Sequence, residues 1–175
     1  MQFTIDISRI WCYTKRSYST KLMDGGAFNY MKREILFRGK GVNDGRWYHG
    51  SYLMMDKTTY CFAEDYEGVN NIEHFIVFDQ MTDWGLPNNH IMVEVDPETV
   101  GQYTGLTDKN RAHIFEGDII TARYVNDGRL TKGVVNFLNG CFCVKYDDYN
   151  NPAIDMLYEY EIIGNIHDNP ELLEG

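Results

Sequence analysis

The sequence lacks any apolar run long enough to cross a bilayer, which takes about 20 consecutive apolar residues. A transmembrane helix is therefore excluded, and we expect a soluble protein with no membrane partner. Basic residues are also scarce: 16 lysines and arginines stand against 26 aspartates and glutamates, and the formal net charge is −10. Because non-specific nucleic-acid binding depends on a long basic stripe, this composition disfavours a nucleic-acid partner without excluding a local exception.

No CxxC motif occurs among the four cysteines, which are Cys12, Cys61, Cys141 and Cys143. The last two alternate along a strand-like segment, which places both thiols on one face and disfavours a disulfide between them. We expect reduced cysteines and a cytoplasmic protein. Zinc binding by Cys141 and Cys143 with distant histidines is an alternative, but buried cysteines more often serve as small apolar residues.

Common catalytic and phosphate-binding motifs are missing too. The chain contains no HExxH, no GxxxxGK[ST] and no GxSxG. Its five histidines are scattered singly, at His49, His74, His90, His113 and His167. We therefore predict no enzyme activity, no catalytic residues, no metal and no cofactor.

The first thirty residues differ in charge from the remainder of the chain. Residues 1–30 contain four basic and two acidic residues, whereas residues 31–175 contain 12 basic and 24 acidic residues. A genuine N-terminal arm and a mis-assigned translation start before Met31 both fit this pattern. We favour the second interpretation and expect a weakly packed extension at 1–30.

Strand-like patterns dominate the chain after Met31. β-branched and aromatic residues predict strands in an N-terminal β region, 31–95, at residues 35–38, 47–54, 58–63, 74–78 and 90–95. The turn Asn43-Asp44-Gly45 predicts a hairpin between the first two of these strands. After this region, Asp96 and Pro97 are typical of a helix start and predict one helical turn.

A second β region is predicted at 96–175. Four short strand patterns occupy residues 118–125, 132–138, 141–146 and 160–166. The tight turns Asn126-Asp127-Gly128 and Asn139-Gly140 connect the first three. This spacing predicts a small antiparallel barrel, which ends in a short helix near Pro170 or in a tail.

The stretch Val100 to Ile120 contains the junction between the two regions. Gly101, Gly105 and Gly117 are expected to serve as structural turn and junction residues, because glycine supplies backbone freedom. Glu116 and Asp118 could form an acid–base pair, but we expect them to be solvated flanks of a bend at Gly117, with amide substitutions costing less than about 0.5 kcal/mol.

Several segments between residues 31 and 174 together form a specific pattern: "TVGQYTGLTDKN", "IFEGD", "MKREILFRGK", "DGRWYHGSYL" and "EIIGNIHDNPELLE". In this pattern the chain resembles the YopX family of bacteriophage and prophage proteins. The resemblance implies a mainly β protein with an SH3-like barrel in the C-terminal part, a phage genome and the host cytoplasm, and it brings no established activity. The thirty preceding residues and "RAHIFEGD", where relatives carry a lysine-rich turn, depart from the pattern.

Two functions from different classes remain open. We favour a non-enzymatic accessory protein that contacts an unknown protein, or a second copy of itself, through strand edges and an acidic surface. The alternative is a nucleic-acid-associated SH3-like barrel, and it depends on a basic group near the start of the β pattern: Lys32, Arg33, Arg38, Lys40 and Arg46. An enzyme of unrecognised type would need several acids and a histidine to converge in one pocket.

Overall fold

The structure is a computed structural model that describes residues 34–58, 62, 72–146 and 151–173. The chain divides into two compact units, Met1–Lys32 and Arg33–Gly175, and all described residues belong to the second. The expected extension at 1–30 and most of the strand expected at 58–63 lie outside the described residues. The described part is mainly β with antiparallel pairing throughout, which confirms the predicted fold class.

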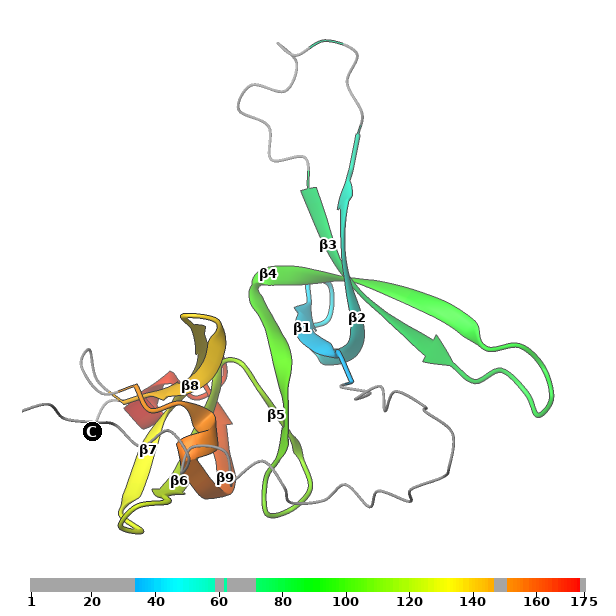
Figure 1. Cartoon of the computed structure of the whole chain (residues 1–175). Coiled ribbons are helices and arrows are strands. Elements are labelled where there is room, and N and C mark those ends of the chain that lie inside the picture. The colour runs from blue at the N-terminus through cyan, green and yellow to red at the C-terminus, as the bar shows by residue number, and fades with distance from the viewer. Residues whose placement is uncertain (1–33, 59–61, 63–71, 147–150, 174–175) are drawn as a thin grey trace, which may run out of the picture. The chain divides into compact units, whose positions relative to one another are not determined.

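Nine strands and two short 3-10 helices make up the described part of the chain (Figure 1). They are β1 (Phe37–Gly41), β2 (Trp47–Asp56), β3 (Ile72–Gln80), β4 (Asn89–Thr107), β5 (His113–Phe115), β6 (Asp118–Tyr124), β7 (Leu130–Leu138), β8 (Cys141–Lys145), η3 (Ile154–Met156), β9 (Leu157–Asn165) and η4 (Pro170–Leu173). The helix expected near Pro170 is thus present as η4.

The first sheet contains β1 to β5, and two of its strands change partners along their length. The first half of β2 pairs with β1 and the second half with β3. β4 pairs with β3, then with β1, and finally with β5. The second half of β2 and the first half of β4 therefore both pair with β3 instead of β1. These segments form a three-stranded arm with β3 at its centre.

Close backbone approach marks the point where β2 changes partner. A Cβ on Gly50 would lie 2.1 Å from the carbonyl oxygen of Val77, so only glycine fits there. Ile76, the residue before Val77 on β3, is fully buried. Burial of one such side chain stabilises the fold by about 2 kcal/mol.

The second sheet has the strand order β8-β7-β6-β9. The predicted tight turn between β7 and β8 contains Asn139 at φ 53° and Gly140 at φ 83°. Two successive positive φ values are typical of a type I′ hairpin turn, which Asn-Gly favours. The SH3-like barrel implied by the family resemblance stays a prediction, because the pairings among the described residues form an open sequence of four strands.

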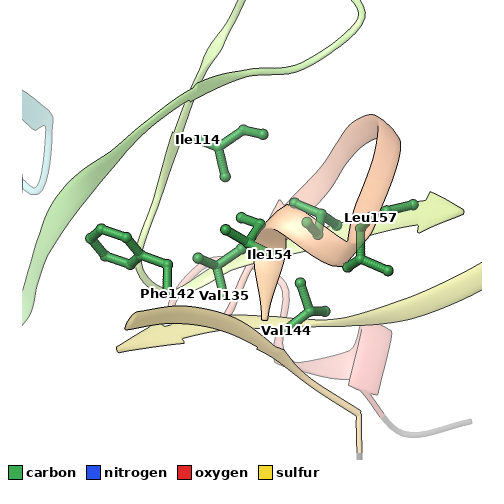
Figure 2. Close-up of a cluster of buried hydrophobic side chains, with 8 residues drawn as sticks. Ile114, Val135, Phe142, Val144, Ile154 and Leu157 are labelled. Carbon is green, nitrogen blue, oxygen red and sulfur yellow. The ribbon is translucent and has the colours of Figure 1, made fainter. Parts of the chain in front are cut away.

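An apolar core fills one side of this second sheet. Figure 2 shows side chains from β5, β7, β8, η3 and β9 meeting there. The cluster consists of Ile114, Ile120, Ala122, Val135, Phe142, Val144, Ile154 and Leu157. Since Ile114 comes from β5 of the first sheet, the two sheets share this core.

The helical turn predicted at Asp96 and Pro97 is wrong, because β4 continues without interruption through 89–107. The Asp96 carboxylate does accept a hydrogen bond from the backbone N–H of Glu98 at 3.1 Å, as a helix cap would. The local turn instead forms a bulge, where β4 carries extra residues between the partners of Arg38 and Lys40. The expected regional boundary at residues 95 and 96 falls within this strand.

Candidate functional site

Two cationic side chains of β1 reach across to the second sheet. Arg38 forms an ion pair with Asp118 at the start of β6, and Lys40 forms one with Asp168 after β9. Alternate residues of a strand share one face, so a single face of β1 holds both contacts. Together with Trp47 of β2, these four residues are called the joint.

The Arg38–Asp118 pair is buried. Nη1 of Arg38 lies 2.6 Å from Oδ1 of Asp118, and the two residues are only 8% and 2% exposed. Nη2 of Arg38 donates to the carbonyl oxygen of Glu116 at 2.9 Å, and the Phe115 N–H donates to Oδ2 of Asp118 at 2.8 Å. Burial raises the pKa of Asp118, while the Arg38 charge and the Phe115 N–H act in the opposite direction.

Aromatic rings enclose the Arg38 guanidinium. Its central carbon lies 4.8 Å from the centre of the Trp47 ring and 5.1 Å from that of Phe115. A desolvated cation over an aromatic face is stabilised by about 2 kcal/mol. The same guanidinium therefore fixes β1, β2 and the turn between β5 and β6 to one another.

The second contact of the joint surrounds Asp168. Its carboxylate accepts hydrogen bonds from Nζ of Lys40 at 2.6 Å, Nε1 of Trp47 at 2.7 Å and Nδ2 of Asn165 at 2.9 Å. These bonds, led by that from Lys40, hold the pKa of Asp168 well below its usual range. The Trp47 ring also lies 5.9 Å from the ring of His167.

Asp168→Asn is expected to lower the free energy of unfolding by about 1 kcal/mol at pH 7, a value reduced for solvent screening of this partly exposed group. A lowered folded-state pKa means that the carboxylate stabilises the fold above its unfolded pKa and loses this effect as the pH falls. The difference between variant and wild type should therefore shrink below about pH 4. Urea unfolding at several pH values measures it, and a difference that persists unchanged in acid would contradict the assignment.

A pocket of about 520 Å³ opens beside the joint. This joint pocket is lined by Arg38, His49, Arg111, Ala112, His113, Phe115, Asp118, Ile162, Gly164 and Asn165. Its walls come from β1, β2, the turn before β5, β5 itself, the first residue of β6, and β9. The stretch Val100 to Ile120 supplies half of the lining residues.

The turn before β5 is held by Asp108. Its Oδ1 accepts hydrogen bonds from the backbone N–H groups of Asn110 and Ala112, at 2.7 and 2.9 Å. Burial alone would raise the pKa of Asp108, but these two bonds, with others from the Asn110 side chain and the Ile162 backbone, lower it on balance. The turn leaves Arg111 at φ 68°, an uncommon conformation for a residue other than glycine, and places its exposed side chain at the pocket.

Two imidazole rings of the joint pocket lie on aromatic neighbours. The His49 ring is 5.2 Å from that of Phe115, and His113 stacks on Tyr103 at 4.4 Å. Partial burial, followed by the charges of Arg38 and His113, lowers the pKa of His49. Burial and these two neighbours favour the neutral form of the His49 ring.

The three glycines expected at the junction lie along the path of the chain toward the second sheet. Gly101 is in β4, where a Cβ would be 2.6 Å from the carbonyl oxygen of Glu116. Gly105 follows in the same strand at φ 88°, and Gly117 lies between β5 and β6 at φ 79°. The backbone N–H of Gly117 donates to the Val135 carbonyl, and its own carbonyl accepts from Ile166.

The expectation that Asp118 is a solvated flank is wrong. Its carboxylate is buried because β1, which is distant in sequence, supplies Arg38 as its counter-charge. Glu116 is half-buried, and its Oε2 accepts a hydrogen bond from the backbone N–H of Gln102 at 3.0 Å. Sequence reasoning missed Trp47 and Arg111 as site residues, and it named Arg38 only as a member of the basic group behind the nucleic-acid alternative.

The basic group behind the nucleic-acid alternative is largely neutralised. Arg38 and Lys40 are paired within the joint, and Nε of Arg46 lies 3.9 Å from the Asp44 carboxylate. Lys32 and Arg33 lie outside the described residues. The described members thus form no free basic stripe of the kind that phosphate binding requires.

Metal ligands do not gather in the part of the chain that the structure describes, where no group of three or more His, Cys, Asp or Glu side chains could hold an ion. Cys141 is exposed and Cys143 is buried, and both are free thiols.

No helix among the described residues is long and apolar enough to cross a membrane.

One face of the three-stranded arm is apolar and partly exposed. The pairings Leu53↔Phe75 and Val77↔Met92 place these side chains on the same side of the sheet. Leu53 is 39% exposed, Met92 is 48% exposed, and Met55 beside them is also exposed. These five residues are called the arm face.

The loop at the end of β3 adds further exposed apolar side chains. Trp84 is 96% exposed, and its neighbours Met81 and Leu86 are exposed as well. Tryptophan at such a position is costly to hydrate and is enriched where proteins bind one another. Figure 1 shows this loop at the far end of the β3–β4 hairpin.

Comparison with known proteins identifies the family of the chain. The model of the family described as YopX protein matches residues 36–174. Two solved structures are similar: protein EF1440 from Enterococcus faecalis, with 25% identity over 80% of this chain and 98% of that chain and a TM-score of 0.41, and protein yopX from Bacillus subtilis, with 18% identity over 82% and 98% and a TM-score of 0.44. The curated proteins gave no match. Because the family model covers most of the sequence, the chain belongs to the YopX family.

Proposed function

We propose that the protein is a non-enzymatic binding protein whose arm face docks a segment of another protein. The observation that supports this function is the continuous apolar surface formed by Leu53, Met55, Phe75, Val77 and Met92. Scattered single apolar residues are normal on a surface, but a contiguous group on one side of a sheet is typical of a contact site.

The charges around the arm face indicate the chemistry of the partner. Glu73, Asp79 and Glu94 lie on the same side of the sheet. They are opposed there by Lys57 and His90, which pair with Glu73 and Asp79. In a chain of net charge −10, we infer a partner segment that carries apolar residues flanked by lysine or arginine.

The arm also offers backbone groups to such a segment. The outer half of β2, Ser51 to Asp56, pairs with β3 alone among the described strands, so its other edge is free to receive an extended peptide. Strand addition of this kind supplies main-chain hydrogen bonds, while alternate side chains contact the sheet faces. A second copy of the acidic chain is disfavoured as the occupant because like charges repel.

A capture experiment tests this proposal. The wild-type chain and a Leu53→Glu/Met92→Glu variant are immobilised, exposed to bacterial lysate and compared by quantitative mass spectrometry. Leu130→Glu/Met156→Glu is the matched control, since both residues are exposed and lie in β7 and η3, away from the arm. We expect a protein with a basic, apolar segment to be retained by wild type and control and to fall by at least about tenfold with the arm variant.

Three results would contradict the proposal. Equal capture by the arm variant would place the contact elsewhere, and a concentration-dependent dimer in light scattering that the arm variant abolishes would identify a second copy as the occupant. Turnover of a substrate by the purified chain would show that the protein is an enzyme.

The biological setting belongs to the same proposal. The family resemblance supports a bacteriophage or prophage gene and action in the host cytoplasm, and the predicted reduced cysteines agree with that compartment. For the second sheet, we likewise propose that it forms a C-terminal barrel of SH3-like form.

A further inference from the structure

The joint pocket contains nitrogen donors that the fold leaves unused. The Arg111 guanidinium and the rings of His49 and His113, all at the pocket, make no hydrogen bond or ion pair within the described part of the chain. These three side chains are exposed, so their donors are available to an acceptor supplied by a ligand.

The charge of the pocket selects an anion. Asp118 is its single lining carboxylate among the described residues, and Arg38 already neutralises it at 2.6 Å. Arg111 therefore contributes an uncompensated positive charge. The Asp108-capped turn holds the backbone on both sides of Arg111, and the Arg111 side chain lines the pocket.

The donor groups at the pocket indicate which chemical class of anion fits it. Guanidinium groups present several N–H bonds in a planar fork that matches phosphate oxygens. Imidazoles add donors whose strength increases when an anion is near. The Arg111 guanidinium and two imidazoles around one cavity are thus suited to a phosphate group.

The size and the rings of the pocket indicate an organic portion on that phosphate. A volume of about 520 Å³ lies within the usual range for small-molecule sites and exceeds the needs of a bare phosphate ion. The rings of His49 and His113 are exposed at the pocket, and imidazole rings, like phenyl rings, stack on nucleobases. We propose that the joint pocket binds a mononucleotide, with Arg111 on the phosphate and the imidazole rings beside the base.

This site is independent of the arm face, because it lies between the two sheets and uses none of the arm residues. A ligand there contacts β1, β2, β5 and β9 at once, so its binding should also stabilise the joint. The concentration of a small phosphorylated molecule would then determine how rigidly the two sheets are held together.

Isothermal titration calorimetry on the full chain tests the proposal with four probes of one class, the 5′-monophosphates of adenosine, guanosine, cytidine and uridine. We expect saturable binding of at least one, and affinity at least about tenfold lower for inorganic phosphate and for the matching nucleoside. Arg111→Asn should weaken binding by about tenfold or more. Asparagine tolerates the positive φ at this position, so the fold should be retained.

Arg129→Asn is the matched control, because Arg129 is an exposed arginine in the β6–β7 turn, paired with Asp127. It should bind as wild type does. His113→Gln, which removes a ring at the pocket, is a second variant expected to weaken binding. Absence of saturable binding for all four nucleotides, equal affinity for phosphate alone, or unchanged binding by both Arg111→Asn and His113→Gln would overturn the proposal.

Discussion

Asp118→Asn is expected to lower the free energy of unfolding by about 3–5 kcal/mol, a large effect for a conservative change. The amide keeps an acceptor for the Phe115 N–H, so the loss comes from the charge. Without it, the buried Arg38 guanidinium has no counter-ion at 2.6 Å and stays desolvated. Urea unfolding at pH 7 measures the change in midpoint and slope.

Two comparisons isolate the ion pair. Glu116→Gln retains the acceptor for Gln102 and should cost less than about 0.5 kcal/mol. Combining Asp118→Asn with Arg38→Met removes both charges, and the double variant should lose at least about 1 kcal/mol less than the sum of the single variants. A loss for Asp118→Asn no larger than that for Glu116→Gln would show that the pair does not stabilise the fold.

Arg38→Met by itself should show a pH dependence of defined sign. Burial already raises the pKa of Asp118, and removal of Arg38 raises it further. The folded protein then keeps a proton that the unfolded chain releases, so the stability of the variant should decrease as the pH rises above about 4. Urea unfolding at several pH values measures this dependence. The free energy of unfolding of wild type should decrease less steeply with pH than that of the variant.

Gly117→Val is expected to cost about 2–3 kcal/mol. The residue has φ 79°, a conformation that a β-branched side chain rarely adopts. Space for a Cβ is not the obstacle, since its nearest neighbours would be Ile166 at 3.5 Å and Arg38 at 3.7 Å, ordinary van der Waals contacts. The expected loss is therefore conformational, and thermal or urea unfolding measures it.

Gly117→Asn is the matched substitution, because asparagine adopts positive φ more readily than valine and should cost less than about 1 kcal/mol. Equal losses for valine and asparagine would indicate that crowding by Ile166 and Arg38 causes the effect. Unfolding of Gly117→Val at the wild-type midpoint would show that the turn accepts another conformation.

Local patterns in the sequence were sufficient for most of the described strands and for the hairpin turns, but they predicted neither β5 nor the continuation of β4 beyond residue 95. The Asn139-Gly140 turn adopts the two positive φ values that this dipeptide favours, and the apolar alternation around it predicts β7 and β8. Such features depend on neighbours within a few residues, so they can be predicted without the fold. The same reasoning failed at Asp96, where a helix-start signal was overridden by the pairing of β4 with β1.

The mainly β class, the tight turns, the acidic character and the family resemblance all come from the residue pattern alone. Burial of Asp118 depends on the tertiary structure, because its charge partner lies 80 positions away in β1 and no local rule connects them. The joint pocket has the same origin, since Arg38, His49 and Arg111 meet through strand pairing over long sequence separations. Ion pairs and cavities form where distant segments pack, so their energies depend on three-dimensional proximity that a residue pattern does not contain.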